Sequence, residues 1–336
     1  MCVKRPFFNG LLALFFLPSP PEEEPIEKSF RTLPSAEIQD FHSDTLHALR
    51  RAKAMQLALR ELSDGSNPAP KKIFRDLMLH EGSAIGHAVT TVRNYMGVSL
   101  QEQRHWRSGR ATVERWRNIV QDVGVFVFKR SMKQRTISGF SLSDSEFPVI
   151  YLNNSTSVGR QLFSIFHELA HVLLNVSGIT KSDTYYIGQL AGKYRRIEVF
   201  CNAFAAEFLV PSTEFAASAG VDFHDDTSVK RLADSFGVSR EVILRRALDF
   251  HLVDQQLYRQ KAQEWAEQAR ATRSAEGGGE YYATQVAYLG SRFLDLAFRR
   301  YHQGRCSREE LAEYLNVKAR SLDGIEHLVI GQPESQ

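Results

Sequence analysis

Hydrophobic positions repeat with a helical period along the first third of the chain. The period marks three segments, which are bounded by capping or helix-breaking residues such as Ser43, Gly65, Ser83 and Gly97. The predicted helices cover about 43–63, 83–97 and 111–122. This part of the chain is therefore expected to be helical.

The period changes to two in the middle of the chain. Three segments there alternate and are rich in Val, Ile and Phe: 123–129, 137–142 and 149–153. A strongly apolar segment, 164–174, follows without Pro or Gly and has the character of a buried helix. This order predicts an α+β fold in which a small sheet precedes a buried helix.

Helical spacing returns after Pro211. Segment 229–243 has the spacing of a helix-turn-helix unit, with Gly237 in the turn and Ser239 as the cap of the second helix. A long polar helix of about 255–273 is predicted next. The segment 307–322 is a second, shorter unit of the helix-turn-helix kind, better suited to packing or to a partner than to DNA.

The residues best suited to chemistry lie in the buried helix, where 166–171 read Phe-His-Glu-Leu-Ala-His. Residues four apart share a helix face, so His167 and His171 can reach one metal ion. Glu168 is placed to take a proton from a metal-bound water. The alternative is a pair of core histidines that hydrogen-bond to the backbone. Burying two imidazoles and a carboxylate without partners would cost several kcal/mol, which favours the metal.

A catalytic metal of this kind needs a third protein ligand and an open position. Four downstream carboxylates are within reach: Asp183, Glu198, Glu207 and Glu214. Glu198 opens a helical stretch that ends at Pro211, and mostly small residues share its face, so this helix can pack close to the histidine helix. Glu207 is nine residues further on and should point away, as a solvated or structural carboxylate. Glu198 is the predicted third ligand; its alternative is a charge that favours the helix dipole.

Two runs of this sequence resemble the ImmA/IrrE family of metallopeptidases. One is 160–171, which contains His-Glu-x-x-His, and the other is 198–211, which is similar to the family's later helix and its closing proline. Cys201 stands where alanine is usual, and it is most simply a small buried residue. The resemblance covers about 110–250 well.

The resemblance implies a zincin-like fold in which His167, His171 and Glu198 bind zinc and Glu168 is the base. It implies that the helices of 229–243 pack as part of the peptidase domain, although DNA reading by them remains an alternative. It also implies a helix-turn-helix repressor as the substrate.

The strand 149–153 is a candidate for substrate binding. As an exposed edge strand it would pair with an extended peptide through Val149, Tyr151 and Asn153, whereas the alternative is an ordinary buried strand. Tyr151, Tyr185 and Tyr186 are unranked candidates for stabilising the oxyanion.

Composition limits the remaining function classes. The chain has 336 residues, 43% of them hydrophobic, which suits one peptidase domain with additional helical parts. A net charge of +3 is too small to indicate strong direct nucleic-acid binding. Three widely separated cysteines indicate a reducing, cytoplasmic location without a disulfide framework. No segment is apolar and long enough to suggest a membrane span.

Four regions are predicted from these features. Residues 1–40 resemble the end of a helix-turn-helix domain and a Pro- and Glu-rich linker, although residues 4–17 also imitate a signal peptide. The other regions are a helical region (41–105), the zincin-like peptidase domain (106–252) and a helical C-terminal extension (253–336).

The sequence therefore predicts a zinc endopeptidase that cleaves a helix-turn-helix repressor. The alternative is a non-catalytic transcriptional regulator or antitoxin-like protein that retains the metallopeptidase fold. In that case a neighbouring toxin is a candidate partner. An intact Glu168 and an open fourth metal position favour the enzyme, because a structural zinc site normally has four protein ligands.

Overall fold

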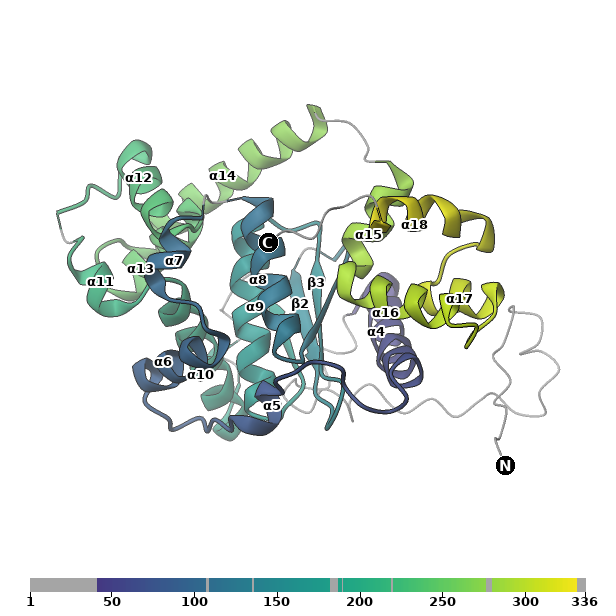
Figure 1. Ribbon diagram of the computed structural model, residues 1–336. Coiled ribbons are helices and arrows are strands. Elements are labelled where there is room, and N and C mark those ends of the chain that lie inside the picture. Colours follow the sequence, from purple (N-terminus) through teal and green to yellow (C-terminus); the bar gives the residue numbers. More distant parts are fainter. Residues whose placement is uncertain are drawn as a thin grey trace.

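The computed structural model has a small sheet with helices on both faces (Figure 1). The residues it describes are 41–106, 109–134, 136–181, 187–188, 190–218, 220–275 and 280–330. The predicted domain remnant and linker of 1–40, and the candidates Tyr185 and Tyr186, lie outside these residues. No helix in the described ranges is long and apolar enough to cross a membrane.

Four strands form the sheet, in the order β1-β3-β2-β4. Their bounds are β1 Phe126–Arg130, β2 Ile137–Leu142, β3 Val149–Asn153 and β4 Gly178–Lys181. β1 and β3 are parallel, whereas β2 is antiparallel to both β3 and β4. β2 and β3 have the predicted bounds, whereas β1 begins three residues later than the predicted strand 123–129, after a turn at Gly124. β4 was not predicted, because it has only four residues and little alternation.

Strand β3 lies inside the sheet, so the prediction of an exposed edge strand is wrong. Both of its sides are paired, with β1 and with β2. Tyr151 stacks on Phe140 with ring centroids 5.1 Å apart, and Val149 is buried in the same core. Asn153 accepts a hydrogen bond from the Met132 amide and donates one to the Ile137 carbonyl. These side chains make contacts within the sheet and its core, so they are not available to bind a substrate strand.

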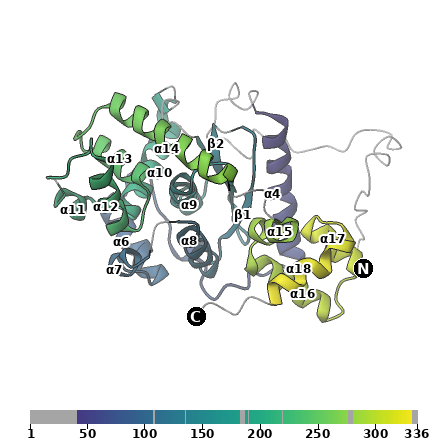
Figure 2. The ribbon, with the colours of Figure 1, turned by 90° about the horizontal axis from the view of Figure 1, so that it is seen from above.

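One face of the sheet is covered by α8 (Arg110–Asp122) and α9 (Val158–Leu173), with α10 (Gly192–Leu209) packed against α9 (Figure 2). Alternate strand residues, such as Ile150 and Leu152, point into this core. Trp116 lies at its centre, with its ring centroid 4.9 Å from Phe166 and 5.4 Å from Phe208. This aromatic cluster joins α8, α9 and α10.

The other face is covered by α4 (Ser43–Leu62) and by the C-terminal helices (Figures 1 and 2). Tyr151, Phe128 and Phe140 point into this second core, and Phe128 meets Phe293 of α16 edge to face at 5.2 Å. Because Tyr151 faces away from α9, it is excluded as an oxyanion partner. The C-terminal helices are α15 (Tyr281–Leu289), α16 (Ser291–His302), α17 (Arg308–Leu315) and α18 (Leu322–Ile330), with a short 3-10 turn η2 (Ala319–Ser321).

The predicted helix-turn-helix spacing is present in α12 (Asp226–Phe236) and α13 (Arg240–Asp249). Gly237 has φ +65° in the turn, and the Ser239 side chain caps α13 by accepting from the Val242 amide. Helix α13 packs on α9 and α10, and α12 packs on α7, so the pair is part of the domain that carries the histidine helix. The remaining helices are α5 (Ile73–Asp76), α6 (Ile85–Met96), α7 (Leu100–Arg104), α11 (Ser212–Ala216) and α14 (Gln255–Ala275).

A buried arginine links the C-terminal helices to the sheet. Arg117 of α8 is 1% exposed and donates to the carbonyls of Val127 (2.7 Å), Ala287 (2.7 Å) and Tyr288 (3.0 Å). It thereby connects α8, β1 and the end of α15. Charged hydrogen bonds of this kind are among the stronger ones in a folded protein.

We expect Arg117→Ala to destabilise the fold strongly, because the buried carbonyl of Val127 and the partly buried carbonyls of Ala287 and Tyr288 would lose their donor. The expected loss is about 3 kcal/mol or more in free energy of unfolding, measured by urea denaturation. Arg292→Ala is the matched control, since Arg292 is 56% exposed in its ion pair with Asp122 and should cost at most about 1 kcal/mol. Equal losses for the two variants would contradict this role of Arg117.

Candidate metal centre

Helix α9 places both histidines in the interior. Its first turn is capped by the Ser157 side chain, which accepts a hydrogen bond from the Arg160 amide at 3.2 Å. From Ser164 to Leu173 every residue is buried, and His167 and His171 have no exposed surface. The predicted buried helix is therefore confirmed.

Helix α10 places Glu198 opposite these histidines. The helix begins at Gly192, so Glu198 lies in its second turn and the alternative of an N-terminal helix charge is wrong. The small residues Cys201 and Ala205 on the same side of α10 are fully buried, and α10 packs along α9, as the sequence predicts. The helix ends at Leu209, just before Pro211.

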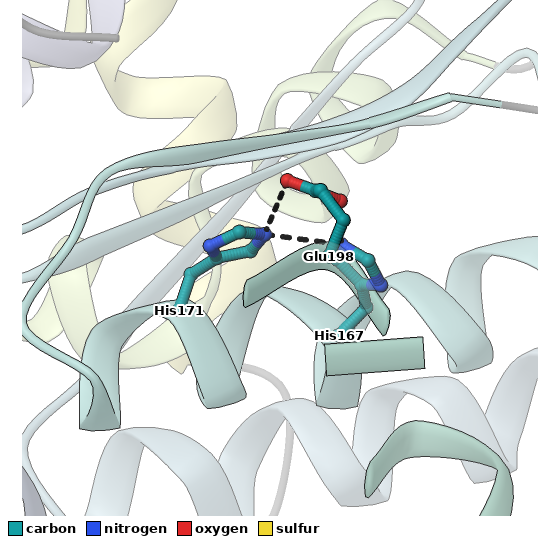
Figure 3. Close-up of side chains that lie close together, drawn as sticks. All are labelled: His167, His171 and Glu198. Atoms are coloured by element: carbon teal, nitrogen blue, oxygen red, sulfur yellow. Dashed lines mark hydrogen bonds and ion pairs between the residues drawn. The ribbon is translucent and has the colours of Figure 1, made fainter. Parts of the chain in front are cut away.

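The three side chains converge on one point (Figure 3). The Nε2 atoms of His167 and His171 are 3.1 Å apart. The Glu198 carboxylate lies 3.4 Å from His167 Nε2 and 3.3 Å from His171 Nε2, through its two oxygens. The three ligand atoms lie within 4.8 Å of one another, and all three residues are buried. Two imidazoles and one carboxylate directed at a common centre are a suitable donor set for a metal ion.

The electrostatics of the cluster favour a positive charge among its members. Burial alone would raise the pKa of Glu198, but His171 and His167 beside it lower that pKa below its usual range. Burial would likewise lower the pKa of His171, but Cys201 and Glu198 raise it well above the usual value. A metal cation between the three side chains would supply this positive charge and leave both imidazoles neutral. The electrostatics of the cluster therefore fit a bound metal ion.

Neighbouring groups fix the orientation of the imidazoles. Asn202, one turn after Glu198, lies with its Oδ1 3.1 Å from His167 Nδ1, so that Nδ1 donates and Nε2 is left for a metal. On the other side, a Cβ added to Gly178 would lie 2.3 Å from the His171 ring. Only glycine allows β4 to approach this closely. Burial raises the pKa of the Cys201 thiol to about 11, which keeps it a neutral side chain beside His171.

Glu168 is held by two hydroxyl groups of the sheet. Ser141 of β2 donates to its Oε2 at 2.6 Å, and Thr180 of β4 donates to its Oε1 at 2.5 Å. All three residues are almost fully buried. Ser141 also accepts from the Gly178 amide at 3.3 Å, which joins this arrangement to β4. The carboxylate next to His167 is therefore oriented by the sheet.

The other carboxylates considered from the sequence lie elsewhere. Glu207 pairs with Arg246 and accepts hydrogen bonds from Ser212, which confirms the prediction that it points away from the cluster. Glu214 forms a surface ion pair with Arg104 at 2.9 Å. Asp183 lies outside the described residues.

Sequence reasoning missed Ser141, Thr180, Gly178 and Asn202 as parts of the site. Three of them lie on strands whose pairing brings them to α9, and no local pattern encodes that pairing. Asn202 could have been found, because it lies four residues after Glu198 and so shares its helix face.

Comparison with protein-family models matches the middle of the chain to a peptidase family. Residues 120–248 match the family model Peptidase_M78, described as an IrrE N-terminal-like domain, which confirms the resemblance noted from the sequence. Among solved structures, the chain is similar to a Mycobacterium tuberculosis transcriptional regulator, at 17% sequence identity and a TM-score of 0.31. That similarity covers 58% of this chain and 51% of the other, about half its length. No curated protein matches the chain.

We expect Ser141→Ala and Thr180→Val each to lower the free energy of unfolding by about 1–3 kcal/mol, because each leaves a buried carboxylate oxygen without its donor. Urea denaturation measures the loss. The matched controls are Thr90→Val and Ser235→Ala, in which an exposed hydroxyl bonded only to its own helix is removed. If the buried and exposed variants were equally stable, these hydroxyls would not support Glu168.

Proposed function

We propose that this chain, whose residues 120–248 form an IrrE N-terminal-like domain of the ImmA/IrrE family, is a zinc-dependent endopeptidase. The observation that carries the proposal is the buried convergence of His167, His171 and Glu198. This donor set, two histidines and one glutamate, leaves a fourth position open, as catalytic zinc sites do. Zinc would be held by the two Nε2 atoms and the carboxylate.

Glu168 is the proposed general base. A zinc ion would supply a Lewis acid for the scissile carbonyl and lower the pKa of a coordinated water to about 7. Glu168 would take the proton of the attacking water and pass it to the leaving amine. Ser141 and Thr180 would keep its carboxylate oriented for both transfers, since each holds one oxygen.

The substrate strand is proposed to pair with β4 in place of β3. β4 is at the end of the strand order in the described sheet, and only β2 pairs with it there. Its first residue, Gly178, lies against the His171 ring, and Thr180 bonds to Glu168. An extended peptide added beside β4 would therefore run past the cluster.

The proposed substrate is a helix-turn-helix repressor in the cytoplasm. The support is the family resemblance noted from the sequence. A folded helix cannot pair with a strand, so cleavage is expected in an exposed loop or a frayed segment. With a net charge of +3, the chain itself is expected to bind duplex DNA weakly and with a steep salt dependence.

One observation favours a second function. His167, Glu168, His171 and Glu198 all have no exposed surface, so a substrate must open the site before it can react. A closed site of this kind also suits a non-catalytic regulator or antitoxin-like protein, with a neighbouring toxin as its partner, in which the metal only stabilises the fold. Only the peptidase would cleave a protein substrate, and the two experiments below test for zinc binding and for this cleavage.

Removal of any of the three ligands should abolish stoichiometric zinc binding. We expect His167→Ala, His171→Ala and Glu198→Gln to bind well under one zinc per chain, measured by metal analysis after dialysis. Glu207→Gln is the matched control and should bind one, because Glu207 pairs with Arg246 away from the cluster. Full zinc occupancy in folded Glu198→Gln would disprove the ligand assignment.

Co-expression with repressors encoded beside the gene tests the activity. We expect one helix-turn-helix repressor to be cut at a single site, followed by intact mass, while casein is cut poorly. Glu168→Gln should retain zinc and lose cleavage by about 10²–10⁴-fold, the usual contribution of a general base. If zinc-loaded wild-type protein cut neither repressors nor casein, the regulator function would replace the peptidase.

A further inference from the structure

A surface cavity lies between the start of α10 and the segment that leads into α6. Helices α6 and α10 pack against each other (Figure 1), and the cavity lies where residues 81–85 meet α10. Residues of α10 between Arg195 and Ala203 form its other wall. In this wall Arg196 is 60% exposed and Val199 is 52% exposed. The cavity is therefore open to solvent.

The cavity is large enough for a bulky side chain. Its volume is about 340 Å³, at the lower end of the roughly 300–1,000 Å³ of clefts that bind small ligands. Its apolar lining comes from Ile85, Val199, Phe200 and Ala203. Covering apolar surface is worth about 25 cal/mol for each Å² removed from water. A partner with an apolar side chain would therefore gain affinity by filling the cavity and covering Val199.

The surroundings of the cavity carry excess positive charge. Glu81 is the one carboxylate of the lining, and it pairs with Arg196 at 3.5 Å. A hydrogen bond from its own backbone lowers the pKa of Glu81, and the charges of Lys193 and Arg196 lower it further, so Glu81 is ionised at neutral pH. Lys193 and Arg195 make no ion pair or hydrogen bond with the residues that the structure describes. Two positive charges therefore remain after Glu81 has neutralised Arg196.

The place of these cations on α10 favours a bound anion. The helix begins at Gly192, so Lys193 and Arg195 lie in its first turn, which contains no acidic residue. The helix dipole is positive at this end and stabilises carboxylates there, whereas it destabilises cations. An anion bound beside Arg195 would offset both the dipole and the repulsion between the cations.

The cavity lies directly outside the metal cluster. Glu198 and Val199 are consecutive residues of α10, and Glu198 is buried at the cluster whereas Val199 lines the cavity. A partner in the cavity would thus be held against the helix that supplies the proposed third ligand. Because the cluster has no exposed surface, a substrate needs binding energy from a second contact to open the site, and contacts remote from the reacting bond supply such energy.

We propose that this cavity docks the protein substrate, away from the cleaved bond, through a large apolar side chain with an aspartate or glutamate beside it. The inference rests on the proposed peptidase function, because the docked partner is the substrate of that peptidase. The apolar side chain would cover Val199 and Phe200, and the carboxylate would bind Arg195 through charge-assisted hydrogen bonds. A lysine or arginine in place of the acid would be repelled, so the cavity discriminates between partners.

A phage-displayed library of random peptides, selected on the zinc-loaded full chain, tests the chemistry of the cavity. We expect enrichment of peptides in which Leu, Met or Phe stands beside Asp or Glu. Calorimetry with one such synthetic peptide should show about tenfold weaker binding when its acid is replaced by the amide, and still weaker binding when it is replaced by lysine.

Substitutions in the cavity should weaken binding of the same peptide. Val199→Asp and Arg195→Glu should each lower its affinity about tenfold or more, because one removes the apolar contact and the other reverses the charge. The matched controls are Leu252→Asp and Arg299→Glu, at residues 45% and 62% exposed that do not line the cavity, and both should bind the peptide like wild type. All four variants should hold one zinc per chain, since none alters a proposed ligand.

Cleavage connects the cavity to the substrate. For a repressor that the wild-type protein cuts, Val199→Asp and Arg195→Glu should lower kcat/KM about tenfold more than they do for a short peptide that spans the cleaved bond. A merely structural effect of these substitutions would lower both values equally.

The outcomes separate the docking site from the peptidase. Selected peptides without an acidic preference, or wild-type affinity in both cavity variants, would disprove the docking site and leave the peptidase in place. A wild-type dimer that Val199→Asp dissociates would also overturn the proposal, because the cavity would then hold a second copy of this chain. Absence of cleavage of every repressor by the zinc-loaded protein would disprove the peptidase, and with it the substrate role of the cavity, even if peptide binding persisted.

Discussion

The structure of this protein depends on burying two imidazoles and a carboxylate at one point between α9 and α10. Such groups are costly to bury unless each is paired, and here they face one another at 3.1–3.4 Å with no exposed surface. A cation among them would offset that cost. The packing around the cluster allows these side chains to meet. Small residues on α10 and the aromatic cluster of Trp116 let α9 and α10 pack closely, and Gly178 lets β4 approach the His171 ring.

Periodicity predicted the local structure well. The three longer helices before the sheet, three strands, the helix-turn-helix pair and the end of α10 before Pro211 all follow from spacing. The short helices α5 and α7 were not predicted, and Ser43 and Ser83 do not cap α4 and α6 as expected. Strand order did not follow, because an alternating pattern does not tell which strands become neighbours. The sequence of β3 is equally compatible with an edge and with the centre, and only the parallel pairing with β1 decides it.

The candidate site also contains residues that local spacing predicts and residues that only the strand pairing brings together. His167 and His171 are brought together by one helix, so their spacing is sufficient to predict the meeting. Glu198 was predicted from the small residues on its face, although its helix begins six residues earlier than expected. Ser141 and Thr180 could not be predicted, since they reach Glu168 through the pairing of β2 with β4.

The coordination of bound zinc tests the central claim most directly. Cys201 lies in contact with His171, so a purely structural site could recruit its sulfur as a fourth protein ligand. X-ray absorption at the zinc edge distinguishes the two cases, because Zn–S bonds are about 2.3 Å and Zn–N or Zn–O bonds are about 2.0–2.2 Å. We predict two imidazoles and light atoms only, with no sulfur, in the zinc-loaded wild-type protein. A sulfur ligand that disappears in Cys201→Ala would contradict an open catalytic site.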